Sequence, residues 1–155
     1  MSRSSARRAR PGDRGSVTVF VVFFAITVLV LASLLVDVGN AVNAQERAAD
    51  LAEQAARSAA DTLNLADLRA GNVAIDTGAA CANASAIIQT YARTSGIQAA
   101  LAPGGCTYQG PGPRQVTVYV SITTTPVITT FFGSFTMTAH ETACAEFGIN
   151  QGVAC

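Results

Sequence analysis

The chain has 155 residues, a formal net charge of zero, one histidine, and neither lysine nor tryptophan. This net charge is the sum of a basic and an acidic part of the chain. Residues 1–15 hold five arginines and one acid, whereas residues 17–155 hold five arginines and nine acids. An acidic main part argues against a nucleic-acid partner, and a single histidine excludes a histidine cluster for zinc or iron.

Residues 17–36, VTVFVVFFAITVLVLASLLV, form a run of 20 residues without a charged side chain. A helix of this length rises about 30 Å, which matches the hydrocarbon core of a bilayer. An arginine-rich leader precedes the run, and Asp37 follows it. We therefore predict a cytoplasmic leader (1–15), a single transmembrane helix (16–38) in the cell membrane, and an extracytoplasmic C-terminal part.

A cleavable secretory signal is the alternative interpretation of this run. Its apolar core would be shorter, about 7 to 15 residues, and the candidate cleavage sequence Val42-Asn43-Ala44 lies well beyond the run. Arg7-Arg8 does not form a twin-arginine signal, because Ala9-Arg10-Pro11-Gly12 follows in place of apolar residues. The pattern favours a permanent span.

Past the span, residues 41–63 are nearly all good helix formers, so the span should continue as one helix, with Gly39 as its weakest point. We predict an amphipathic helical stem over residues 39–63. Its charged face carries Glu46, Asp50, Glu53, Arg57 and Asp61. Its opposite face is a packing stripe of Ala44, Ala48, Leu51, Ala52, Ala55 and Ala59. Side chains this small predict close packing against a sheet or another helix.

Residues 64–155 predict one small extracytoplasmic domain that begins with helical segments. Residues 65–78 contain many loop formers and allow one helical turn at 66–69. A helix is expected over residues 79–95, where apolar side chains recur at helical spacing, and Gly96 should end it.

Strands follow in the second half of this domain. Residues 106–108 form a short strand at best between Pro103-Gly104-Gly105 and a second turn over residues 110–113. Residues 115–125 and 134–147 alternate between apolar and polar side chains, which is typical of half-buried strands that pair antiparallel. The fold class is therefore α+β: a long transmembrane helix continuing into an amphipathic stem, then a small domain with one helix and a short antiparallel sheet.

The connection VITTFFG, residues 127–133, is too apolar for an ordinary surface loop. Its large side chains are Ile128, Phe131 and Phe132. We favour their closing the end of the core, and the alternative is a contact patch for a membrane surface or a partner protein.

All four cysteines lie on the outer side of the span, as an oxidising compartment permits. Pairing in chain order joins Cys81 to Cys106 and Cys144 to Cys155, and it is one of three possible pairings. The first bond would contribute about 3 kcal/mol by the chain-entropy model.

The sequence has no catalytic signature. The cysteines lack CxxC spacing, and neither a phosphate-binding loop nor a GxSxG turn occurs. We expect a protein that is not an enzyme, holds no cofactor or metal, and takes no small-molecule substrate.

Three motifs together are similar to the TadE/TadG-like proteins of the tight-adherence (Flp) pilus system. They are Gly15-Ser16-Val17-Thr18-Val19-Phe20 after the arginine-rich leader, Leu34-Leu35-Val36-Asp37-Val38-Gly39 at the end of the span, and the helix Gln45–Ala56. The resemblance implies a membrane-held, pseudopilin-like protein with a pilin-like outer domain. The membrane and other pilus or secretion-system proteins would be its partners, and a separate ATPase would power assembly.

The resemblance also implies a processing bond. Family members that are processed like prepilins are cut after a glycine, and here the corresponding bond joins Gly15 to Ser16. Phe20 stands where such prepilins carry glutamate. This departure favours an accessory subunit over a major pilin. The competing interpretation is a membrane-tethered binding or adhesin module unrelated to pili, and a third is a secreted domain released by signal peptidase.

Overall fold

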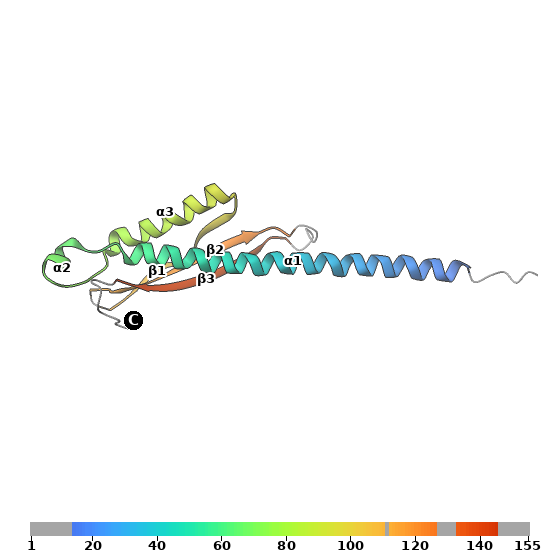
Figure 1. Cartoon of the computed structure of the whole chain (residues 1–155), viewed down its shortest axis with the longest axis horizontal. Helices are drawn as coiled ribbons and strands as arrows, with labels where there is room; N and C mark the ends of the chain where they lie inside the picture. Colours follow the sequence, from blue (N-terminus) through green and yellow to red (C-terminus); the bar gives the residue numbers. More distant parts are fainter. Residues whose placement is uncertain (1–13, 111, 127–132, 146–155) are drawn as a thin grey trace, which may run out of the picture.

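The computed structural model describes residues 14–110, 112–126 and 133–145. They form three helices, α1 (Arg14–Ala60), α2 (Leu65–Arg69) and α3 (Thr77–Ser95), followed by the strands β1 (Gln98–Gln109), β2 (Gln115–Thr124) and β3 (Phe135–Cys144). The predicted α+β class, with a long N-terminal helix ahead of a small helix-and-sheet domain, is confirmed (Figure 1).

Helix α1 is one continuous element of 47 residues, and it passes through Gly39 without a break. No proline interrupts it, and its second half is rich in alanine, the strongest helix former. In Figure 1 its first half projects far beyond the domain, and its second half lies along the strands. The span and the stem are therefore two surfaces of a single helix.

The turn from α1 back to α3 is held by side-chain caps. The side chain of Asn64 accepts hydrogen bonds from the backbone N–H groups of Ala66 and Asp67 and starts α2. Asp76 does the same for Gly78 and Ala79 at the start of α3. These carboxamide and carboxylate oxygens satisfy N–H groups that a helix end leaves unpaired. Helix α3 ends where it was predicted to, because Gly96 takes the left-handed conformation at φ 69°.

The sheet is antiparallel in the order β1-β2-β3, with β2 in the centre. Residues on one face of β2 are fully buried: Val116, Val118, Val120 and Ile122. The first three belong to the same core cluster as Leu51 of α1 and Ile88 of α3. Helices α1 and α3 therefore cover one face of the sheet, and no described element covers the other face.

Strand β1 departs from the sequence expectation. Only residues 106–108 were predicted as a short strand, with Pro103-Gly104-Gly105 as a turn, whereas β1 spans Gln98–Gln109. Leu101 pairs with Val120 and Cys106 with Val118, so the residues between them bulge out of the ladder. Gly104, at φ 111°, lies against the ring of Tyr119, 3.4 Å from where a Cβ would stand. Glycine thus allows the strand to continue through a bulge where the sequence pattern indicated its end.

Candidate functional site

The first half of α1 exposes an unbroken apolar surface. Its large hydrophobic side chains from Val17 to Val36 are between 46% and 75% exposed. Within the described residues, α1 is the one helix long and apolar enough to cross a membrane. Exposing an apolar surface of this length to water is energetically unfavourable, so the composition of this half of α1 supports membrane anchoring.

The hydroxyl groups in this half of α1 are satisfied by its own backbone. Thr27 donates to the carbonyl oxygen of Phe23 at 2.8 Å, and Ser33 donates to that of Val30 at 2.8 Å. An unsatisfied hydroxyl is costly in hydrocarbon. These two residues are therefore compatible with a bilayer.

The second half of α1 carries the alanine-rich face of the stem, which the structure places in the core. Exposure is 3% or less for every residue of the expected stripe, Ala44, Ala48, Leu51, Ala52, Ala55 and Ala59. Ala56 and Ala60 are equally buried and were not assigned to the stripe. Most of these residues join the cluster with Val116, Val118 and Val120 of β2, and Ala44 and Ala48 join Ile122 and Ala139. Their small side chains allow α1 to lie close to the sheet.

The opposite face of the stem is exposed and charged. Glu53 and Arg57 form an ion pair one turn apart, with side chains 51% and 71% exposed. A solvated helical pair of this kind contributes only a few tenths of a kcal/mol. The charged face is thus a solvated surface that contributes little to the stability of the fold.

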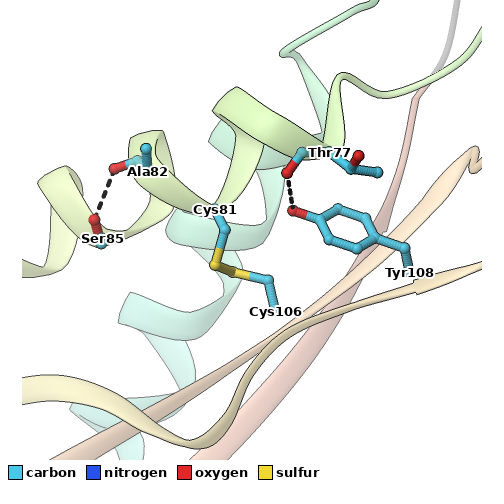
Figure 2. Close-up of a disulfide and its surroundings, with 6 residues drawn as sticks. All are labelled: Thr77, Cys81, Ala82, Ser85, Cys106 and Tyr108. Carbon is cyan, nitrogen blue, oxygen red and sulfur yellow. Dashed lines mark hydrogen bonds between the residues drawn. A yellow bond between two sulfur atoms is a disulfide. The ribbon is translucent and has the colours of Figure 1, made fainter.

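A disulfide joins Cys81 of α3 to Cys106 of β1, with their Cα atoms 5.8 Å apart. Beside it, the hydroxyl of Tyr108 donates to the carbonyl oxygen of Thr77 at 3.3 Å, as Figure 2 shows. Partial burial raises the pKa of the Tyr108 phenol, and the negative charge of Asp76 raises it further. A hydrogen bond with the backbone of Cys81 acts in the opposite direction and is outweighed. Helix α3 is thus linked to the edge strand by one covalent bond and one hydrogen bond, in addition to the apolar packing of the two elements against one core cluster.

The second expected disulfide reaches beyond the described residues. Cys144, at the end of β3, is not a free thiol. Its expected partner, Cys155, lies outside the residues that the structure describes, so the Cys144–Cys155 bond stays a prediction.

The uncovered sheet face is rich in threonine and carries the single histidine. His140 of β3 stacks on Tyr119 of β2 with ring centroids 5.2 Å apart. Thr117 and Thr142 share a hydrogen bond across the same two strands at 2.7 Å. Among the described residues, no group of three His, Cys, Asp or Glu side chains is placed to hold a metal ion.

Two further predicted features lie at the margins of the described residues. The candidate processing bond Gly15–Ser16 falls in the first turn of α1. The candidate contact patch of Ile128, Phe131 and Phe132 lies outside the described residues.

One feature was missed by the sequence reasoning: a hollow where the stem meets the span. Asn40, Asn43 and Arg47 of α1 line it together with Thr124, the last residue of β2, and Thr125 just after it. Spacings of three and four residues place Asn40, Asn43 and Arg47 on one side of a helix, and this was the available signal. The sequence could not show that the end of β2 faces the same side.

Comparison with known proteins identifies one relationship. Residues 15–62 match the family described as Putative Flp pilus-assembly TadE/G-like. No curated protein and no solved structure matches the chain. The matched segment runs from the second residue of α1 to two residues past its end, and the resemblance drawn from the span and stem motifs is confirmed there. This match supports a role related to assembly of Flp/Tad pili.

Proposed function

We propose that the chain is a membrane-anchored, pseudopilin-like accessory component of a Flp/Tad-type pilus or secretion apparatus. Its role is structural, without catalysis, and its partners are the membrane and other proteins of the apparatus. The leader is cytoplasmic and the α+β domain extracytoplasmic, as the five arginines of residues 1–15 indicate.

One observation carries this proposal: a single helix serves both as the apolar span and as the central element of the domain core. A flexible linker would let the domain move independently of its anchor. Here α1 continues directly from exposed apolar side chains into the buried alanine stripe. A lateral contact made by the span within the bilayer is thereby transmitted to the position of the outer domain.

The first test is co-purification from membranes after mild cross-linking of the tagged full-length chain. The platform and ATPase proteins of the pilus apparatus should be recovered with it. A matched control replaces residues 17–36 by leucine, which keeps the anchor and removes its specific side chains. Recovery should fall in that control if the span is the contact surface. Absence of every pilus protein from the wild-type sample would reject the proposed role.

The second test is the N-terminal residue of the membrane-fraction protein, measured by mass spectrometry. A start at Met1 or Ser2 fits the permanent anchor of an accessory subunit. A start at Ser16 would instead indicate prepilin-type processing and entry into a filament. A start near Gln45 in the soluble fraction would contradict membrane anchoring.

A membrane-tethered binding or adhesin module is the second candidate, and the uncovered sheet face favours it. Tyr119 and His140 present a stacked aromatic pair among hydroxyl groups. If this face is the functional surface, the variant Tyr119→Ala/His140→Ala should lose attachment of cells and keep its pilus proteins. If the pilus role is correct, the variant with leucine at residues 17–36 should lose its pilus proteins, and the Tyr119→Ala/His140→Ala variant should keep them.

A further inference from the structure

We propose that the hollow between α1 and the end of β2 binds the phosphodiester group of a membrane phospholipid. This inference rests on the membrane anchoring proposed above. It assigns a ligand class to a surface that the pilus role leaves without a function.

The hollow has a volume of about 340 Å³, at the lower end of the roughly 300 to 1,000 Å³ of small-ligand sites. Its rim is polar, with Asn40, Asn43 and Arg47 on α1 and with Thr124 and Thr125 at the end of β2. Its remaining lining is apolar and consists of Ala44, Ile97 and Ile122. Ala44 and Ile122 are buried and pack in one cluster with Ile97, so this wall is part of the folded domain.

The rim is suited to an anion. Arg47 is the one charged side chain that lines the hollow, and no carboxylate lines it. Among the described residues Arg47 has no ion pair, whereas Arg57 of the stem pairs with Glu53. A guanidinium offers five N–H donors in a planar fork, and the asparagine amides and threonine hydroxyls add neutral donors. A singly charged phosphodiester matches one cation surrounded by such donors.

The height of the hollow along α1 matches the lipid headgroups. Exposed apolar side chains continue past Val36 to Val38 and Val42, which are 52% and 53% exposed. At about 1.5 Å per residue, Asn40 lies roughly 3 Å beyond Val38, and Arg47 roughly 13 Å beyond it. Side chains lean toward the helix N-terminus, so the guanidinium can reach back about one turn. The headgroup layer is roughly 5 to 8 Å thick, and the donors fall within or next to it.

The position in the fold determines the source of the phosphate. The hollow lies in the layer of the core formed by Ala44, Ala48 and Ile122. Ala44 and Ala48 are the first residues of the buried stripe along α1, and the part of α1 that precedes the stripe projects beyond the domain (Figure 1). The opposite end of the domain, around α2, is the end farthest from the span. A lipid held in the bilayer beside α1 is therefore at high local concentration near the hollow, whereas a phosphate ion from solution is not.

The test is native mass spectrometry of the full-length chain in detergent, titrated with dioleoylphosphatidylglycerol. Dioleoylglycerol, with the same acyl chains and no phosphate, is the parallel probe. We expect the phospholipid to be retained in preference to the diacylglycerol. Arg47→Gln should weaken this retention about tenfold, the effect of losing a charge-assisted contact. Arg69→Gln, an exposed arginine of α2 at the far end, is the matched control and should leave it unchanged.

Three results would overturn the site. They are equal retention of the two lipids by the wild type, an Arg47→Gln variant that binds like the wild type, and equal losses in Arg47→Gln and Arg69→Gln. Displacement of the lipid by millimolar inorganic phosphate would assign the hollow to free phosphate. An intact Cys81–Cys106 bond on a non-reducing gel and an unchanged circular dichroism spectrum confirm that each variant is folded. A chain that leaves the membrane on carbonate extraction would refute the anchoring itself, so the two failures are distinguishable.

Discussion

Cys81 on α3 and Cys106 on β1 are bonded across a Cα–Cα distance of 5.8 Å, although 25 positions separate them in the chain. The bond joins the third helix, α3, to an edge strand of the sheet. Only two interior residues of α3 besides Ile88 are buried, and both are alanines. Ile87 and Tyr91 add partly buried packing, and the covalent bond adds to this limited apolar attachment.

Removing this disulfide should destabilise the domain by about 3 kcal/mol, because the unfolded chain gains the freedom of the opened loop. The variant is Cys81→Ala/Cys106→Ala, in which both sulfurs are removed and no unpaired thiol is left. Denaturant unfolding in detergent, followed by circular dichroism, measures the loss. An unfolding midpoint equal to that of the wild type would contradict the assigned attachment.

Enlarging the alanine stripe should separate α1 from the sheet. Ala52 is fully buried, so Ala52→Leu should cost about 1 to 3 kcal/mol through overpacking. Ala82→Leu is the matched control, because Ala82 is an exposed alanine on α3. Thermal unfolding should shift clearly for the first variant and by far less for the second. Similar shifts would mean that the stripe tolerates larger side chains.

The bulge in β1 should require glycine at position 104. Gly104→Ala places a methyl group 3.4 Å from the Tyr119 ring on a backbone at φ 111°, which should cost about 1 to 3 kcal/mol. Gly39→Ala is the comparison, since nothing lies within 4 Å of that position and alanine favours a helix. Thermal melts of the two variants should therefore move in opposite directions or differ strongly.

Tyr108 should make stability fall at alkaline pH. Partial burial raises the pKa of its phenol above the usual value of 10.0, so the folded state holds the proton that the unfolded state releases. The contribution is complete below the unfolded pKa and is lost as pH rises through the folded pKa. Unfolding measured from pH 9 upward should show this decline, and Tyr108→Phe should reduce it. Ultraviolet titration of that variant should also lose the ionisation step of the Tyr108 phenol, whose pKa lies above 10.0.

The C-terminal pair is tested directly by peptide mapping under non-reducing conditions. Pairing in chain order predicts a peptide that links Cys144 to Cys155, alongside the Cys81–Cys106 peptide. Reduction should split each cross-linked pair into two peptides whose summed mass is two hydrogens greater than that of the pair, whereas a bond within one peptide should raise the mass of that peptide by two hydrogens. A peptide linking Cys155 to Cys106 or Cys81 would show that a different pairing forms in the cell.

Much of the fold follows from local patterns in the sequence. The charge-free run and the alanine-rich stem predicted α1, and Gly96 predicted the end of α3. Alternation of valine with polar residues identified β2 and the face of it that is buried. The stem's apolar face was predicted from helical periodicity alone, as was its need for a close neighbour.

Other features depend on contacts between distant residues. Strand β1 was underestimated because Pro103 and two glycines resemble a turn, and only pairing with β2 shows that the strand continues through them. The hollow at Arg47 exists because the end of β2, with Ile122 and Thr124, lies beside the stem although it is far along the chain. No local pattern contains that information.

The sequence by itself determined where the helices and the two regular strands form, which side of each is apolar, and that one helix is long enough for a membrane. These properties follow from periodicity, helix propensity and capping within a few residues. The tertiary structure alone decided that α1 lies against β2 and β3, that Cys81 bonds to Cys106, and that Asn40 and Arg47 share a hollow with Thr124. Such relationships depend on strand register and close packing, through which residues tens of positions apart become neighbours.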